Sequence, residues 1–304
     1  MASPTRTVLP DDVRDRIARL EIQAASLVEG LISGMHKSPF HGFSVEFAQH
    51  REYTWGDELK HVDWKVFGRT DRFYIKQYEE ETNLQAMCLV DQSESMLYKG
   101  ERAHVSKYEY AATLAAALAF VLVRQQDSVG LTLFDEEVQA RIQPTAHPRQ
   151  LRTMAHAMSN VELHGESAKP GVLPRLAEEL RRRGLVFLIS DLFVPIEDFV
   201  TALRHLRHRR HEVVVLHVLD PDELDFPFQD NTRFEGLEGV VPHLLSDPRS
   251  LRDAYLDEVR EFLEQVEGAC TDARTDYVRI NTGVPPAVSI SQYLRMRLKR
   301  RGGR

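Results

Sequence analysis

The chain has 304 residues, 42% hydrophobic and 28% charged, so it can bury a sizeable core and disorder is not expected. Its 46 acidic and 39 basic residues give a formal net charge of −7, which offers no general reason to expect nucleic-acid binding. Two cysteines, Cys88 and Cys270, cannot staple a chain of this length, and such low cysteine usage is typical of a reducing compartment.

The N-terminal part of the chain is expected to form a region appended to the main fold. Residues 11–33 carry apolar side chains at helical spacing after two aspartates, so they predict a helix. Residues 35–84 are dense in aromatic residues and in charges of both signs, and they include Trp55 and Trp64. Alternating side chains predict a strand near 72–79.

No segment is expected to span a membrane. The longest apolar stretch, 114–123, is too short to cross a bilayer and indicates a buried helix. Residues 1–10 lack the apolar region of a secretory signal. We therefore expect a soluble, cytoplasmic protein.

From residue 85 onward, apolar strands alternate with helices. Continuous apolar strands of this kind predict an α/β fold with a doubly wound, mostly parallel sheet of Rossmann-type topology, covered by helices on both faces. The expected domains are 1–84, 85–285 and a C-terminal helix with a basic tail at 286–304. The expected strands lie at 85–90, 128–134, 138–142, 185–189, 213–219 and 277–280, and the expected helices at 105–124, 148–159, 172–183, 196–209, 249–268 and 286–300.

The sharpest motif follows the first of these strands. Asp91, Ser93 and Ser95 alternate on the loop directly after it, and another expected strand ends at Asp191. Because the carboxyl ends of parallel strands meet at one edge of a sheet, these side chains should lie together. Carboxylate and hydroxyl oxygens are hard ligands that suit Mg²⁺. The motif therefore predicts a divalent metal site, and the alternative is that the loop only caps the following helix and closes the turn.

The run from Val90 to Met96 resembles the DxSxS element of the metal-ion-dependent adhesion site in von Willebrand factor A domains. A second block, upstream, resembles the DUF58 family, which places such a block just before a von Willebrand A-like region. The two likenesses together cover roughly residues 35–220. The upstream block consists of Phe43, Ser44, Arg51, Glu52, Tyr53, Gly56, Asp57, Val62, Asp63, Trp64, Arg69 and Lys76.

This resemblance implies a von Willebrand A-like core whose ion is held by Asp91, Ser93, Ser95 and Asp191, with an open coordination position that a partner's carboxylate completes. Members of the family often accompany MoxR-type AAA+ ATPases, which implies an adaptor role beside such an ATPase. The family site usually takes a threonine from a later loop, but the comparable stretch here, 165–172, contains none. Ser167 could substitute for it, or Lys169 could fill the site with its own ammonium charge.

An enzymatic alternative stays open. A metal-dependent hydrolase or nuclease would use Asp57, Asp63 and Asp91, or Asp63 together with Lys76 and the glutamates at 79–81. The spacing does not place the second set on alternate positions of one strand pair, and no P-loop, dinucleotide-binding glycine fingerprint or G-x-S-x-G turn is found. We therefore expect a protein-interaction module rather than an enzyme, in which the aromatic block fastens the appended region to the sheet.

Overall fold

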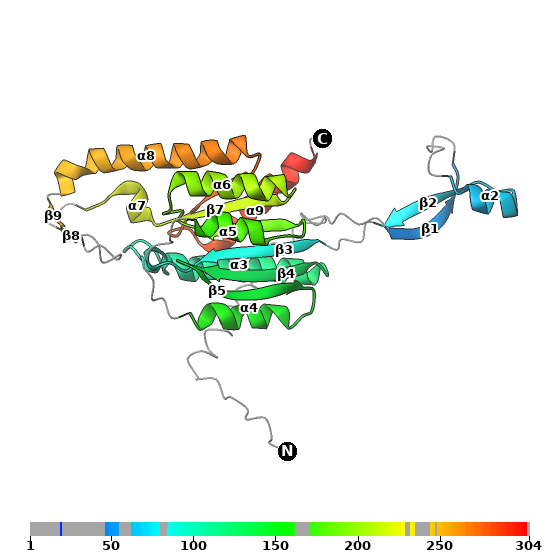
Figure 1. Cartoon of the computed structure of the whole chain (residues 1–304), viewed down its shortest axis with the longest axis horizontal. Coiled ribbons are helices and arrows are strands. Elements are labelled where there is room, and N and C mark those ends of the chain that lie inside the picture. The colour runs from blue at the N-terminus through cyan, green and yellow to red at the C-terminus, as the bar shows by residue number, and fades with distance from the viewer. Residues whose placement is uncertain are drawn as a thin grey trace, which may run out of the picture. The chain divides into compact units, whose positions relative to one another are not determined.

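A computed structural model describes residue 19 and residues 46–54, 62–79, 84–161, 171–228, 232–234, 244–246 and 248–302 (Figure 1). The chain divides into a small unit, Phe40–Leu84, and a larger unit that contains Gln85–Arg304. The helix predicted at 11–33 lies outside the described residues except for residue 19, which is helical.

The larger unit is built on one six-stranded sheet with the order β10-β7-β6-β3-β4-β5. Neighbouring strands are parallel except β5, which runs antiparallel to β4 at one edge. The central strands are mostly apolar and are buried along nearly their whole length because both faces are covered, which confirms the predicted doubly wound sheet. The strands are β3 (Gln85–Asp91), β4 (Ser128–Phe134), β5 (Val138–Thr145), β6 (Leu185–Ser190), β7 (Glu212–Leu219) and β10 (Asp276–Asn281).

Helices cover the two faces of this sheet in separate layers. On one face, α5 (Val172–Glu179), α6 (Ile196–His208) and α8 (Pro248–Asp272) pack with side chains of β3, β6 and β7 into one apolar core. On the other, α3 (Lys107–Arg124) contacts α4 (Gln150–Ser159) and α9 (Pro286–Gly302) as well as the sheet. None of the described helices is both long enough and apolar enough to cross a bilayer.

The central helix α3 is buried on nearly all sides, in keeping with its alanine- and leucine-rich sequence. Ser106 begins it with a capping box, in which the serine hydroxyl accepts from the N–H of Glu109 and the Glu109 carboxylate accepts from the N–H of Ser106. This cap fixes the start of the helix, and Lys107 is therefore its first residue.

Short elements join the strands at the carboxyl edge of the sheet. A single 3₁₀ turn, η2 (Glu94–Leu97), follows β3, and α7 (Pro221–Asp225) follows β7. A two-stranded ribbon of β8 (Thr232–Phe234) and β9 (Leu244–Ser246) precedes α8. None of these was predicted, because elements of three to five residues carry too little periodicity to be found in a sequence.

The small unit contains a hairpin of β1 (Glu46–Glu52) and β2 (Tyr74–Glu79), and a helix, α2 (Trp64–Thr70). The strand predicted at 72–79 is thus present as β2. The Asp63 carboxylate accepts from two backbone N–H groups at the start of α2 and caps it. Trp64 and Phe73 remain 59% and 43% exposed, although their rings contact each other and Phe67.

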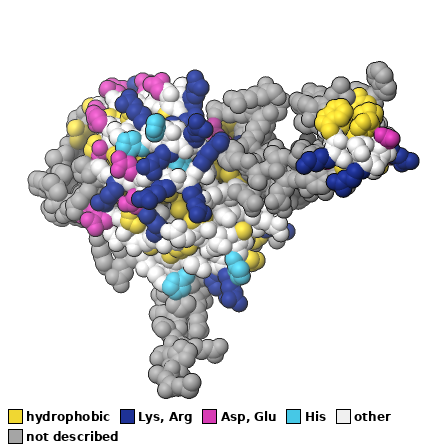
Figure 2. All heavy atoms as spheres, turned by 45° about the vertical axis from the view of Figure 1, so that its right-hand side comes forward, with side chains coloured by type: hydrophobic (Ala, Val, Ile, Leu, Met, Phe, Trp, Pro, Cys, Tyr) yellow, Lys and Arg dark blue, Asp and Glu magenta, His cyan; other side chains and the backbone are white. Residues whose placement is uncertain are grey.

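Basic side chains gather where the strands of the larger sheet begin, at the end opposite to the candidate site. Lysine and arginine side chains gather on the face turned toward the viewer in Figure 2. The amino ends of the strands carry such side chains: a hollow there is lined by Arg141, Arg182 and His211 together with the first residues of β3 and β6. Arg141 pairs with Glu179 in this region. The polar groups discussed next lie at the opposite, carboxyl edge.

Candidate functional site

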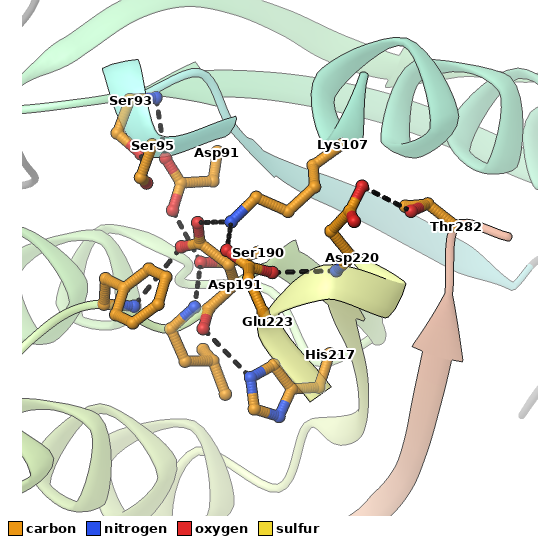
Figure 3. A network of polar contacts seen from close by, with 12 residues as sticks. Asp91, Ser93, Ser95, Lys107, Ser190, Asp191, His217, Asp220, Glu223 and Thr282 are labelled. Atoms are coloured by element: carbon orange, nitrogen blue, oxygen red, sulfur yellow. Dashed lines mark hydrogen bonds and ion pairs between the residues drawn. The ribbon is translucent and has the colours of Figure 1, made fainter. Parts of the chain in front are cut away.

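The carboxyl ends of β3, β6 and β7 bring several acidic side chains together (Figure 3). Asp91 is the last residue of β3, Asp191 follows β6, and Asp220 follows β7. The three strands are adjacent and parallel, so their ends lie at one edge, as the sequence predicted. The three aspartates are 0–1% exposed.

The Asp91 carboxylate accepts hydrogen bonds from the loop that follows β3 and from the neighbouring strand β6. Its Oδ1 accepts from the backbone N–H of Ser93 at 2.9 Å, and its Oδ2 accepts from the Ser190 hydroxyl at 2.5 Å. Burial and the nearby Asp191 carboxylate raise the pKa of Asp91 to about 6. The hydroxyl oxygens of Ser93 and Ser95 lie 3.0 Å apart and hydrogen-bond to each other.

A lysine that the sequence analysis did not single out lies at the centre of the site. The Lys107 side chain is 0% exposed, and its Nζ lies 2.8 Å from Asp191 Oδ2 and 2.5 Å from Glu223 Oε1. The same Nζ lies 5.0 Å from the centre of the Phe193 ring, within cation–π range. Burial disfavours the charged form, but the carboxylates of Asp191 and Glu223 outweigh it and raise the pKa of Lys107.

The loop after β7 is tied to the same network. The second carboxylate oxygen of Glu223, Oε2, accepts from the backbone N–H of Asp220 at 2.7 Å and closes a capping box at the start of α7. Asp220 Oδ2 accepts from the N–H of Gly100 at 3.0 Å and from the Thr282 hydroxyl at 3.2 Å. The carboxylate of Asp220 therefore joins the loops that follow β3 and β10.

A neutral histidine, His217, hydrogen-bonds to the backbone of Asp191. One ring nitrogen of His217, Nε2, lies 2.9 Å from the backbone oxygen of Asp191, and Nδ1 lies 2.9 Å from the Tyr277 hydroxyl. Burial is the main cause that lowers the pKa of His217 to about 4. A neutral imidazole can donate to a carbonyl through only one nitrogen, so Nε2 carries the proton.

The four residues predicted to bind a metal, Asp91, Ser93, Ser95 and Asp191, do lie together at the site. Ser167 and Lys169, the predicted substitutes for the family's threonine, lie outside the described residues. The sequence analysis did not single out Lys107 or Glu223. The sequence signal that could have found Lys107 is its position: it is a charged first residue of an otherwise apolar helix, directly after a capping serine.

The oxygen donors suit a divalent ion in kind, but the buried ammonium of Lys107 already pairs with one of them. Both oxygens of Asp91 already accept hydrogen bonds, and Asp191 Oδ2 faces an ammonium group. Among the described residues, no group of three or more His, Cys, Asp or Glu side chains could hold a metal ion. The site as built does not fit Mg²⁺, and binding of such an ion by these residues stays a prediction.

The candidate enzymatic residues are not gathered in a described site. Asp57 lies outside the described residues, and Asp63 belongs to the small unit, where it caps α2. Asp91 is the remaining member of that set and belongs to the larger unit.

These features define a class of protein: one with a von Willebrand factor A-like fold and a polar network at the carboxyl edge of its sheet. The chain belongs to the DUF58 family: the model described as "Protein of unknown function DUF58" matches residues 49–264. Uncharacterized proteins of Mycobacterium tuberculosis and Mycobacterium bovis are 28% identical to it over 244 residues, which cover 78% of this chain and 74% of theirs.

One solved structure with a TM-score of 0.50 agrees with the fold, and two others are less similar. An aerotolerance-related membrane protein from Bacteroides fragilis matches 71% of this chain and 99% of its own, at 16% identity and a TM-score of 0.50. BatB from Bacteroides thetaiotaomicron matches the same shares at 18% identity and a TM-score of 0.47. The SpRpn10 VWA domain matches 68% of this chain and 93% of its own, at 13% identity and a TM-score of 0.38.

Proposed function

We propose that this protein is an interaction module that binds a protein partner at the carboxyl edge of its sheet and acts by binding rather than by catalysis. The von Willebrand A-like fold suggests protein interaction in general. The observation that supports a location at this edge is two exposed apolar side chains, Leu97 and Phe193, on the loops that follow the adjacent strands β3 and β6. They are 37% and 47% exposed.

The two side chains differ in what fixes them: backbone hydrogen bonds fix the turn that carries Leu97, whereas the Phe193 ring itself contacts other side chains. Leu97 ends the 3₁₀ turn after β3, whose backbone is bonded to Ser93 and Ser95. Phe193 follows β6, its ring stacks on Phe262 with centroids 6.2 Å apart, and it lies over the Lys107 ammonium. Large apolar groups that are rigid and exposed are typical of the centres of protein interfaces.

The buried state of the acidic groups also supports binding over catalysis. Asp91 and Asp191 are 1% and 0% exposed, so neither carboxylate is accessible to a substrate in the folded structure. A catalytic base needs to come within hydrogen-bond reach of the substrate. The metal-dependent hydrolase or nuclease is therefore the weaker alternative.

The family resemblance supplies a first candidate for the partner. We propose a MoxR-type AAA+ ATPase, because DUF58 proteins often accompany such enzymes, and an adaptor role beside it. The alternative is the adhesion site, in which a divalent ion held by Asp91, Ser93, Ser95 and Asp191 contacts a carboxylate of the partner. It requires the ion to compete with Lys107 for Asp191. Binding through Leu97 and Phe193 does not need that ion.

The experiment compares two exposed aromatic surfaces of the same chain. Binding to the purified MoxR-type ATPase is measured by biolayer interferometry for the wild type, Phe193→Ser and Trp64→Ser. Because a central aromatic anchor contributes about 2 kcal/mol or more, Phe193→Ser should weaken binding roughly 30-fold, whereas Trp64→Ser should bind like the wild type. Loss of binding in Trp64→Ser alone would move the interaction to the small unit.

The role of a metal is tested in the same assay. Binding is repeated with Mg²⁺ and with EDTA, and Asp91→Ala serves as the control for the Mg²⁺ that the ATPase itself carries with its nucleotide. Loss of binding both in EDTA and in Asp91→Ala supports the adhesion-site alternative. Binding that persists in Asp91→Ala shows that the partner does not use an ion at this site.

A further inference from the structure

We propose that the ammonium group of Lys107 takes the electrostatic place of the divalent ion predicted at the DxSxS loop, so that this site is completed by the chain's own cation. The inference goes beyond the proposed function, because it holds whether or not a partner binds at this edge. It rests on the contacts of three carboxylates and on the burial of one lysine.

The ammonium group of Lys107 is fixed inside the protein. Lys107 is the first residue of α3, and its position is fixed by the Ser106 cap and by its own N–H, which donates to the Tyr98 backbone oxygen at 3.1 Å. Its side chain is 0% exposed. A lysine side chain near a surface normally extends its charge into water, so full burial shows that its partners lie inside the protein.

Both oxygens of three carboxylates at the site have a named donor. The oxygens of Asp91 accept from the Ser93 N–H and the Ser190 hydroxyl. Those of Asp191 accept from Lys107 Nζ at 2.8 Å and from the Phe193 N–H at 3.3 Å. Those of Glu223 accept from Lys107 Nζ at 2.5 Å and from the Asp220 N–H at 2.7 Å. Each of these oxygens keeps a second lone pair, so the bonds to neutral donors do not by themselves exclude an ion. At Asp191, however, an ion on Oδ2 would have to displace the Lys107 ammonium or share the oxygen with it.

The serine hydroxyls hydrogen-bond within the site. The oxygens of Ser93 and Ser95 lie 3.0 Å apart and hydrogen-bond to each other. Adjacent ligands of an octahedral Mg²⁺ also lie about 3 Å apart, so this spacing is compatible with either cation, Mg²⁺ or the Lys107 ammonium, and does not distinguish them. The Ser190 hydroxyl is likewise committed to Asp91. The hydroxyls satisfy each other and the nearby carboxylate without a metal.

The positive charge of Lys107 opposes the entry of a second cation. An ammonium group carries three donors, and at this site two carboxylates and the face of the Phe193 ring surround it. A divalent ion bound beside Asp191 would lie close to this buried positive charge, where repulsion is screened far less than in water. Mg²⁺ also gives up its water shell reluctantly, which adds to the cost of entry.

The proposal is tested by measuring metal binding to the full chain. Wild-type protein treated with EDTA is titrated with Mn²⁺ and followed by electron paramagnetic resonance, and its thermal unfolding is compared in millimolar Mg²⁺ and in EDTA. The expected result is no stoichiometric Mn²⁺ binding and the same melting temperature in both buffers. One bound Mn²⁺ per chain that is lost in Asp91→Ala would overturn the proposal.

Lys107→Met removes the charge at nearly constant volume, and Lys99→Met makes the same change at an exposed position of the same loop region. We expect Lys107→Met, unlike Lys99→Met, to acquire stoichiometric Mn²⁺ binding and to melt higher with Mg²⁺ than with EDTA. A folded Lys107→Met protein that ignores both ions would also overturn the proposal. Should this variant fail to fold, the titration of the wild type decides by itself.

Discussion

Removal of the Lys107 charge should destabilise the protein strongly. In Lys107→Met, the buried carboxylate of Asp191 and the partly buried carboxylate of Glu223, whose side chain is 16% exposed, lose their shared cation. Breaking a buried ion pair by removing one partner costs about 3–5 kcal/mol, because the remaining charge is left uncompensated. For a unit of this size, such a loss lowers the melting temperature by roughly 6–20 °C.

The magnitude follows from burial rather than from the number of ion pairs. The side chains of Lys107 and Asp191 are 0% and 1% exposed, and methionine fills nearly the same space, so the cavity contribution is small. The surface pair of Arg260 and Asp257, with side chains 66% and 72% exposed, is the matched control. Arg260→Met should change stability by less than about 1 kcal/mol.

The assay is urea unfolding of both variants, followed by circular dichroism at neutral pH in EDTA. Adding Asp191→Asn to Lys107→Met should recover part of the lost stability, because it neutralises one of the two carboxylates left without a counter-ion. A loss in Lys107→Met no larger than that in Arg260→Met would refute the reasoning, since it would show that the buried carboxylates do not depend on the ammonium.

Two further predictions concern the same edge. Burial holds the pKa of His217 at about 4 against an ordinary 6.5, so its contribution is full above pH 6.5 and is lost as the pH falls toward 4. The pKa of Asp91 is about 6 in the folded protein against an ordinary 3.8, so protonation of Asp91 below pH 6 favours the folded state. His217→Gln lacks the opposing effect of the histidine and should therefore gain stability as the pH falls from 6 to 4 in urea titrations. A loss of stability over this range would contradict the argument. Gly100→Ala would bring Cβ to 2.3 Å from Asp222 Oδ2, and it should cost about 1–3 kcal/mol of unfolding free energy. Gly268→Ala, with nothing within 4 Å inside α8, should instead stabilise by about 0.5–1 kcal/mol in the same measurement, and equal effects of the two substitutions would disprove the steric argument.

The central fold was predictable because its strands are buried on both faces. Such strands leave continuous apolar runs, and the predicted 128–134 and 213–219 agree with β4 and β7 to within one residue. The expected helix at 172–183 was too long: α5 ends at Glu179, and three exposed arginines at 181–183 form the turn into β6. Charged residues have good helix propensity, so the sequence pattern alone did not mark this end.

The candidate site was predictable only where local sequence encodes it. Asp91, Ser93 and Ser95 share one loop, and the rule that parallel strands end at a common edge brought Asp191 to them. Lys107 was not predicted, because a lysine at a helix start usually extends into water. Its partners, Asp191 and Glu223, lie 84 and 116 residues away along the chain. Contacts over such separations depend on tertiary packing, which no spacing pattern records.

The polar network links the loop geometry of this edge to its apolar surface. Buried ion pairs seldom stabilise a fold more than apolar packing would, so added stability is a weak explanation for two carboxylates around one buried lysine. Their geometric effect is more specific: Lys107 joins α3 to the ends of β6 and β7, and its ammonium lies under the Phe193 ring. The backbone N–H of Phe193 is bonded to Asp191 as well. The network thus fixes Phe193 from two directions, and an anchor fixed before binding loses less conformational entropy when a partner covers it.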